Sequence, residues 1–227
     1  MKPSENKKSS KNESLQDYRL VEYDDYFITN KNKKVNLKHL GEKTAQMSSY
    51  FFEYFKGYNI PCAFVEKESK KKVKLLNTDD FGFEIKIINS TDARTAKIFS
   101  VNKGSPLQIP LIEYHYGSSK DSLVTESHLI SFDICTYDEL KLMNRLCSKI
   151  NAILSSFLER RNTLLLELMC IFGKFEGKIY LVGDFSPGSI KVFDNEKKDK
   201  LPDPFKIESF AQMRKYSDYL LKLTNGD

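Results

Sequence analysis

Three carboxylates and one lysine in the C-terminal part of the chain have the side-chain types that hold a metal-bound phosphate. Glu167 lies in an apolar run, Asp184 in a loop rich in Gly, Ser and Pro, and Lys191 and Asp194 in the next apolar segment. These side chains can converge where strands end beside one loop. Carboxylates with Mg²⁺ hold nucleotide triphosphates in proteins, because this hard cation takes oxygen ligands and bridges phosphate oxygens.

Each of these residues also has a purely structural interpretation. Asp184 stands in the kind of loop in which Asp commonly forms a turn. Glu167, flanked by leucines, is equally suited to be a paired structural carboxylate, and Lys191 to be a solvated strand residue. The sequence leaves both interpretations open.

A second polar cluster follows an alternating segment earlier in the chain. It comprises Glu84, Asn89, Asp92, Arg94 and Lys97. Arg and Lys three residues apart can bind a phosphate ester, since the Arg guanidinium offers a planar fork and Lys a point charge. A charged surface loop is the alternative.

The cysteines and histidines indicate no metal centre. The four cysteines and three histidines are far apart, and no pair has the short spacing of a zinc site. Cys147 and Cys170 lie in apolar segments and are expected to be small buried thiols. The chain also has no GxGxxG, GxxxxGK[ST] or GxSxG motif, so the common nucleotide and hydrolase motifs are absent.

Charge and composition exclude several broad classes of protein. The net charge of +5 is concentrated in residues 1–14 and 66–74, which favours a solvated tail and hairpin tip over a nucleic-acid groove. With 40% hydrophobic residues, the chain can form a core. No apolar run reaches the ~18 residues of a membrane span, and no secretory signal is present. We expect a soluble, cytoplasmic protein that binds neither nucleic acid nor membrane.

The apolar pattern predicts the elements that position the two clusters. The clearest signal is a capping box of Thr136 and Glu139, followed by apolar residues at spacings of three and four up to Phe157. The order of elements predicts an α+β fold with antiparallel sheets. The expected elements are a disordered leader over 1–14, strands over 18–28, 64–65, 73–76, 83–88 and 111–116, helices over 42–56 and 137–157, strands over 164–172 and 179–182 around a turn at 173–177, a strand over 190–193, and a last helix capped by Ser209.

The order of these segments resembles a known family. The stretch GKFEGKIYLVGDFSPGSIKVFD from Gly173 to Asp194 is similar to the hairpin and DE-x-SPD-x-x-R-x-W-D signature of SAICAR synthetases. Those enzymes make phosphoribosylaminoimidazole-succinocarboxamide in purine biosynthesis. The segment FEIKIIN, residues 83–89, resembles that family's E-x-V-x-R-N strand. Further matches are Lys97, Gly104 and Pro110 to its GS-x-x-K-R, Gly and Pro, and Gly41 with the later Asn59-Ile60-Pro61 to its KG and gIP segments.

The resemblance, which runs from about Tyr18 to Leu223, implies a two-lobed fold with ATP and Mg²⁺ in the cleft between the lobes. We expect the smaller, β-rich lobe over 15–80 and the larger α+β lobe over 81–227. The family reaction activates the carboxylate of carboxyaminoimidazole ribotide with ATP, and the amine of aspartate then displaces phosphate. Carried over to this chain, the resemblance implies Glu84 and Glu167 as cofactor-binding residues, Asn89, Arg94, Lys97 and Lys191 as substrate phosphate-binding residues, and Asp184 as the metal ligand.

Several family motif residues are replaced in this chain. The family's phosphate-covering Gly-Lys-x-Lys hairpin has no counterpart at or before Tyr18. Its strand D-x-K-x-E-F-G reads ELMCIFG from Glu167 to Gly173, so that Met169 and Ile171 replace a Lys and a Glu. The remaining replacements are Gly183, Asp184 and Gly188 for three acids, Ile88 and Lys191 for arginines, Ala93-Arg94 for the GS pair, and Gly117 for a Lys. Losing several such groups at once predicts that efficient catalysis is lost.

Three functional hypotheses follow from these residues. The chain is a diverged SAICAR synthetase, its ligase activity weakened or lost, in which Asp184 and Glu167 still hold Mg-ATP; a non-catalytic binding or subunit-interaction module on the same fold; or a repurposed phosphotransferase that uses Arg94 and Lys97. The expected partner is a nucleotide or phosphorylated small molecule, and a homo-oligomer stays open.

Overall fold

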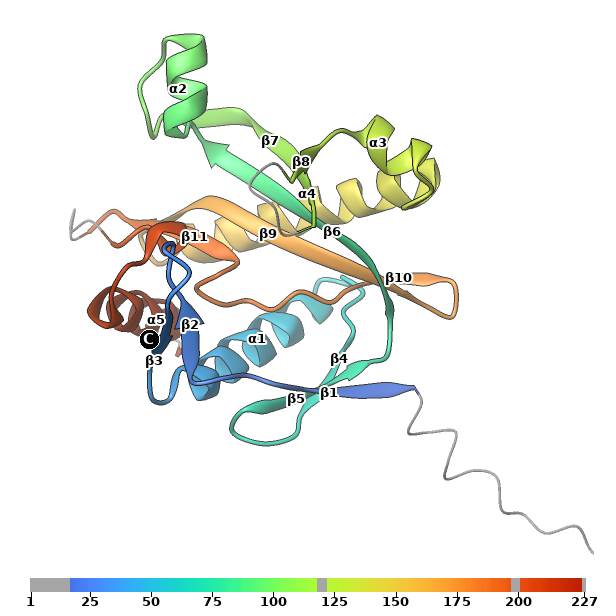
Figure 1. Cartoon of the computed structure of the whole chain (residues 1–227), viewed down its shortest axis with the longest axis horizontal. Coiled ribbons are helices and arrows are strands. Elements are labelled where there is room, and N and C mark those ends of the chain that lie inside the picture. Colours follow the sequence, from blue (N-terminus) through green and yellow to red (C-terminus); the bar gives the residue numbers. More distant parts are fainter. Residues whose placement is uncertain (1–16, 118–121, 197–200, 226–227) are drawn as a thin grey trace, which may run out of the picture.

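Two long antiparallel strands, β6 (Asp79–Ser90) and β9 (Thr163–Phe175), form the centre of the main sheet (Figure 1). The computed structural model describes residues 17–117, 122–196 and 201–225, so the leader expected over 1–14 lies outside the described residues. The sheet has the order β10-β9-β6-β7-β8, with β11 also paired to β9. The other strands are β7 (Pro106–Tyr116), β8 (Leu123–Val124), β10 (Lys178–Leu181) and β11 (Ile190–Asp194).

The long helix α4 (Tyr137–Glu159) packs its apolar stripe against β9 and β6. The expected capping box is confirmed: Glu139 N donates to Thr136 Oγ1 at 3.2 Å, and Thr136 N donates to Glu139 Oε2 at 2.8 Å. These bonds satisfy two backbone donors at the helix start. Alternate residues of β6 face this helix, and Phe83, Ile85 and Ile87 are buried there. The opposite face of β6 therefore carries Glu84 and Lys86.

The N-terminal part forms a three-stranded sheet, β1-β5-β4, and a two-stranded β2–β3 pair beside helix α1 (Leu40–Lys56). The continuous strand expected over 18–28 is wrong. The chain bends at Tyr23–Asp25, because Asp25 accepts a hydrogen bond from Gly41 N at 3.0 Å and pairs with Lys71. The strands are β1 (Tyr18–Glu22), β2 (Tyr26–Ile28), β3 (Lys34–Asn36), β4 (Phe64–Lys67) and β5 (Lys72–Leu76).

The hairpin formed by β9 and β10 turns later than the sequence predicts. Strand β9 continues through Gly173 to Phe175, and the turn is at Glu176 and Gly177. Gly173 belongs to the strand because it lies against Thr78 and Asp80: a Cβ there would be 2.6 Å from each of their side-chain oxygens. The glycine marks a close approach of chains rather than the turn.

Helix α1 anchors the loop that carries Asp184. Phe51, Phe52 and Phe55 contact the ring of Phe185 with centroid distances of 5.6, 5.6 and 5.0 Å. Phe185 N also donates to Ser48 Oγ at 3.1 Å. A loop with a buried aromatic ring and a satisfied backbone donor is held firmly, so Asp184 has a defined position beside the sheet.

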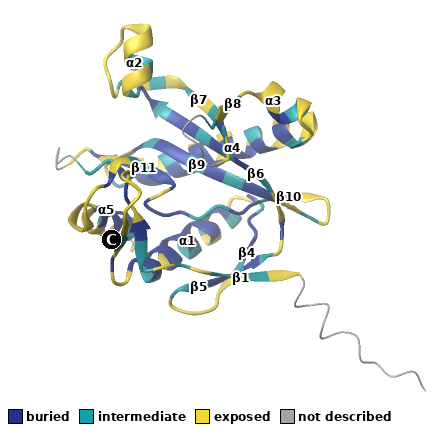
Figure 2. Ribbon diagram, in the orientation of Figure 1, coloured by how far each residue is buried: buried dark blue, intermediate teal, exposed yellow. Residues whose placement is uncertain are grey.

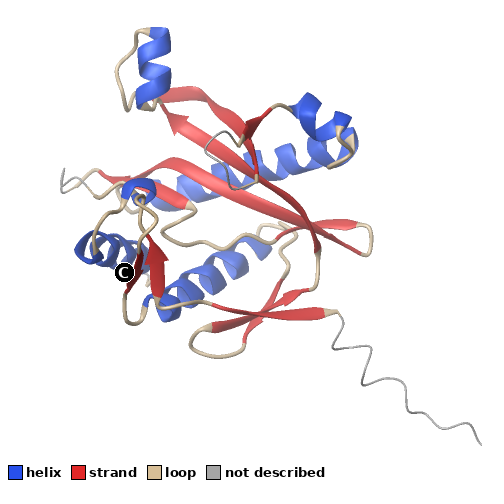
Figure 3. Cartoon of the chain, viewed as in Figure 1, coloured by secondary structure: helices blue, strands red, loops and turns tan. Residues whose placement is uncertain are grey.

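The remaining helices complete an α+β architecture, which confirms the predicted fold class (Figure 3). Helix α5 (Phe210–Thr224), capped by Ser209 as expected, packs on α1, whereas α2 (Ala93–Phe99) has no buried residue (Figure 2). The short elements are α3 (Glu126–Ser131) and η2 (Pro204–Lys206). Within the described residues, none of the helices combines the length and apolar character required to span a bilayer. The division into lobes near residue 80 stays a prediction.

Candidate functional site

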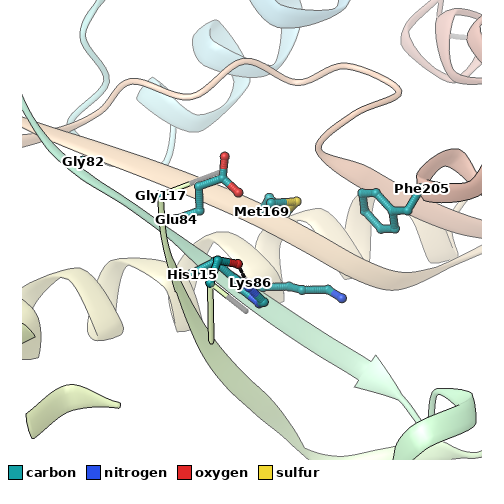
Figure 4. Close-up of a pocket in the computed structure, with 8 residues that line it drawn as sticks. Gly82, Glu84, Lys86, His115, Gly117, Met169 and Phe205 are labelled. Atoms are coloured by element: carbon teal, nitrogen blue, oxygen red, sulfur yellow. Dashed lines mark hydrogen bonds between the residues drawn. The ribbon is translucent and has the colours of Figure 1, made fainter. Parts of the chain in front are cut away.

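A cavity of about 740 Å³ lies on the face of the main sheet opposite α4 (Figure 4). Residues of three neighbouring strands line this cavity. Those on β6 are two residues apart and therefore share one face of the strand. A volume of this size is typical of small-molecule sites. The cavity is lined by Gly82, Glu84 and Lys86 of β6, His115 of β7 with Gly117 and Ser122 beyond it, Met169 of β9, and Phe205 of η2.

One side of the cavity is closed by an ion network centred on Glu167. This carboxylate is only 5% exposed. Its Oε2 lies 2.6 Å from Lys86 Nζ and its Oε1 lies 2.7 Å from Lys191 Nζ. Lys191 also contacts Asp203 Oδ2 at 3.1 Å. Burial opposes the charge on Lys191, but the bonds to Glu167 and Asp203 outweigh it and raise the pKa of that ammonium. Lys191 is therefore a paired, half-buried lysine and not the solvated strand residue that the sequence also allowed.

Phe205 covers the two ammonium groups of this network. Lys86 Nζ lies 5.5 Å and Lys191 Nζ 5.9 Å from the centroid of its ring. Figure 4 shows Lys86 extending toward Phe205, with Met169 between this end of the cavity and Glu84. Two lysines and two carboxylates balance in charge, so this wall offers a closed ionic network rather than free cations.

Glu84 is the carboxylate that this network leaves unpaired. Among the described residues it has neither a hydrogen bond nor an ion pair, although its negative charge acts on Asp184. Burial raises the pKa of Asp184, the charge of Glu84 raises it further, and a hydrogen bond from Ser186 Oγ at 3.2 Å opposes both. Tyr23 lies beside Asp184, and burial together with that carboxylate raises its pKa. Glu84 in the cavity wall thus acts on the buried carboxyl of Asp184, and no ion pair within the described residues involves either group.

Asp194 does not converge with Glu167 and Asp184. It stands at the end of β11 opposite Thr163, and its Oδ1 accepts a hydrogen bond from Glu196 N at 2.9 Å. A separate cavity of about 300 Å³ lies there, lined also by Arg160 and Arg161. The four residues expected to converge therefore do not form one cluster, since Asp194 lies apart from Glu167, Asp184 and Lys191.

The predicted phosphate-binding residues other than Lys191 also lie away from the cavity. Asn89 is on the α4 face of β6, where its side-chain amide and that of Asn151 donate to each other at 2.9 and 2.8 Å. Arg94 and Lys97 are on α2, whose start is capped by Asp92 through a hydrogen bond from Thr95 N at 2.7 Å. The segment is a short exposed helix rather than the charged surface loop considered as the alternative, and phosphate binding by Arg94 and Lys97 stays a prediction.

No metal-binding cluster is evident in the described part of the chain. Over residues 17–117, 122–196 and 201–225, no group of three or more His, Cys, Asp or Glu side chains is arranged to hold a metal ion. All four cysteines are buried free thiols. Burial raises the pKa of the Cys62 thiol to about 12, which makes it a poor nucleophile.

Comparison with known proteins identifies the family. The family model of SAICAR synthetase matches residues 8–210. The chain belongs to the SAICAR synthetase family. It is 28% identical over 208 residues to the phosphoribosylaminoimidazole-succinocarboxamide synthase of Clostridium kluyveri, covering 89% of this chain and 88% of that protein.

Solved SAICAR synthetases share this fold. The Ehrlichia chaffeensis enzyme superposes with a TM-score of 0.82 at 22% identity, covering 91% of both chains. A SAICAR synthetase in complex with ADP has a TM-score of 0.82 at 23% identity, covering 92% of both chains. The recognised family and its fold are thus confirmed.

Two positions where the SAICAR synthetase motif has acids adjoin each other in this chain. Gly183 N donates to Ile171 O at 3.2 Å, and a Cβ at position 183 would lie 3.1 Å from Ile171 Cβ. The branched Ile side chain fills the place into which a residue at 183 would project. This corner is therefore an apolar contact between β9 and the loop.

Sequence reasoning missed Lys86, His115 and Phe205 as cavity residues. For Lys86 a signal was available, since it alternates with Glu84 onto the same strand face. His115 needed the pairing of β6 with β7, and Phe205 needed the fold of the segment after β11.

Proposed function

We propose that this member of the SAICAR synthetase family uses the cavity to bind a ligand, and that the ATP-dependent ligation of aspartate to carboxyaminoimidazole ribotide is weakened or lost in it. The observation that supports this most directly is the contact of Ile171 with Gly183. The family motif has two acids there, and this chain has an apolar pair.

The charges around the cavity argue in the same direction. Phosphoryl transfer needs cations at the developing charge, and such groups contribute several kcal/mol each. Lys86 and Lys191 are both engaged by Glu167, and Lys191 also by Asp203. Their positive charge is therefore already balanced before a triphosphate arrives.

The described donor set does not fit a magnesium triphosphate. Of the predicted ligands, Glu84 and Asp184 lie near each other, whereas Glu167 is occupied by two lysines. Mg²⁺ commonly uses one or two carboxylates together with phosphate oxygens, but among the residues that the structure describes, no uncompensated lysine or arginine lines this cavity to hold the phosphates. Asp184 as metal ligand, and Glu84 and Glu167 as cofactor ligands, stay predictions.

An activity assay tests the proposal directly. The purified protein is incubated with ATP, Mg²⁺, aspartate and carboxyaminoimidazole ribotide, and release of ADP is followed, with the Clostridium kluyveri enzyme as positive control. We expect no release above background. Turnover within tenfold of the control would contradict the proposal.

A thermal shift with Mg-ATP tests the ligand set separately. A site with a Kd of about 10 µM would raise stability by ~2.7 kcal/mol at about 1 mM ligand. We expect no shift of the melting temperature. A shift that Asp184→Asn removes would instead assign the metal to Asp184 and overturn the misfit stated above.

A second candidate function is assembly with another copy of the chain, favoured by an exposed apolar face. Phe99 on α2 is 70% exposed and Ile109 on β7 is 81% exposed. Strand β8 pairs with Tyr114 and His115, so in the described part of the chain most of the β7 edge away from β6 is unpaired. An edge of this kind can meet its own copy about a twofold axis. Sedimentation velocity of the wild type and Ile109→Ser tests it, and a wild-type monomer at all concentrations would exclude it.

A further inference from the structure

We propose that the cavity takes a small organic cation, a protonated aliphatic amine without a phosphate group. Its ammonium pairs with Glu84, and its hydrocarbon chain lies along Met169 toward Phe205. This inference rests on the proposed function, namely binding without efficient ligation, and names the class of ligand.

Among the described residues, the charge left over in the cavity is negative. Lys86 and Lys191 are balanced by Glu167 and Asp203, with ammonium-to-carboxylate distances of 2.6 to 3.1 Å. What remains is Glu84, which has no partner among the described residues and faces the charge of Asp184. A cation beside Glu84 relieves this repulsion, whereas a phosphate would increase it.

His115, on the adjacent wall of the cavity, lies between a hydroxyl and a carboxylate. Its Nδ1 lies 3.1 Å from Ser122 Oγ, and its Nε2 lies 3.4 Å from Glu113 Oε2. Nε2 is buried and makes no hydrogen bond within the described residues, and the nearby Glu113 carboxylate adds negative charge to this side of the cavity. Lys86, the one lysine or arginine among the described lining residues, is already paired with Glu167, so a phosphate ester finds no uncompensated ammonium or guanidinium there.

An ammonium ion fits this lining better than a metal ion does. A metal ion held by the protein without a phosphate needs several ligating side chains, and no group of three His, Cys, Asp or Glu suited to a metal exists within residues 17–117, 122–196 and 201–225. An alkylammonium needs one carboxylate for its charge and apolar surface for its chain. Met169 and Phe205 supply that surface, and the face of an aromatic ring also attracts cations.

Titration calorimetry with butylamine as probe, which has one ammonium and an apolar chain, tests the inference at low salt, where exposed charges are least screened. We expect one binding event per chain and a raised melting temperature. Glu84→Gln should weaken binding at least tenfold. The matched control is Glu66→Gln in the exposed β4–β5 hairpin, which carries an ion pair to Lys74 away from the cavity and should leave binding unchanged. Inorganic phosphate should not bind.

Two further experiments test the inference, one with a Phe205 variant and one with Mg²⁺ in place of the amine. Phe205→Ala removes apolar surface without touching Glu84, and it should weaken butylamine binding several-fold even if the Glu84 variant fails to fold. Titration with MgCl₂ alone asks whether the site prefers a metal. Butylamine binding that is absent, or that survives both substitutions, would overturn the inference, as would Mg²⁺ binding that depends on Glu84. None of these results bears on ligase turnover, whose detection would contradict the proposed function instead.

Discussion

Lys86 of β6 lies directly opposite Met169 of β9 in the antiparallel pair. Its ammonium reaches Oε2 of Glu167, two residues from Met169 along β9, at 2.6 Å. The family motif that β9 resembles has a lysine at the position of Met169. The positive charge beside Glu167 therefore comes from the neighbouring strand, and the carboxylate keeps a partner although its own strand has lost one.

This cross-strand arrangement predicts that a swap of the two residues is tolerated. Lys86→Met leaves buried Glu167 with Lys191 alone and should lower the free energy of unfolding by about 1–3 kcal/mol. Adding Met169→Lys returns an ammonium to the same strand face and should recover at least half of the loss. Urea unfolding of the wild type, both single variants and the double variant gives the coupling energy. A double variant no more stable than Lys86→Met would contradict the swap.

The same pair shows how far the sequence could predict the site. Alternation along residues 83–88 predicts a half-buried strand with Glu84 and Lys86 on one face. Which residue lies opposite Lys86 depends on the register between β6 and β9, and that register follows from packing across long stretches of chain. The helix caps at Thr136 and Ser209 depend only on local residues, and both are confirmed.

Asn89 marks the limit of motif-based prediction. The family motif contains both Glu84 and Asn89, five positions apart on one strand. Successive side chains of a strand point to opposite faces, so residues separated by an odd number of positions lie on different faces. The contact of Asn89 with Asn151 depends on how α4 packs, which no local pattern reveals.

The ion pair of Glu139 predicts a loss of stability in acid. Hydrogen bonds from Lys174 and from Thr136 N lower the pKa of Glu139 below its usual 4.5. Since the pKa is lower in the folded state, this stabilisation is present above the unfolded pKa and is lost as the pH falls through the folded one. Glu139→Gln can still accept at the helix start but carries no charge. It should cost about 0.5–1 kcal/mol at neutral pH.

Urea unfolding of the wild type and Glu139→Gln between pH 7 and about pH 3 measures this difference. The gap between the two proteins should close below the usual pKa of 4.5. A gap that stays constant with pH would show that the charge of Glu139 is not what stabilises the fold.

Gly41 is predicted to be intolerant of any side chain. A Cβ at this position would lie 2.1 Å from the carbonyl oxygen of Tyr23, a backbone atom that cannot rotate away. Gly41→Ala must displace either the start of α1 or the bend at Tyr23–Asp25, and should cost about 3 kcal/mol. Gly188→Ala is the matched control, because its nearest neighbour is Ser186 Oγ at 3.5 Å. It should stay within about 0.5 kcal/mol of the wild type in thermal unfolding. Equal melting temperatures for the two variants would contradict the close approach.

The amide pair of Asn89 and Asn151 predicts that two substitutions cost less than one. Asn89→Leu leaves the Asn151 amide, which is only 7% exposed, without its partner and should lower the free energy of unfolding by about 1–3 kcal/mol. Replacing both residues by Leu removes the unsatisfied amide and adds apolar contact between β6 and α4. The double variant should therefore recover most of the loss in urea unfolding. If Asn89 binds a phosphate rather than holding the helix, the single variant will match the wild type in stability, and phosphate will shift the melting temperature of the wild type alone.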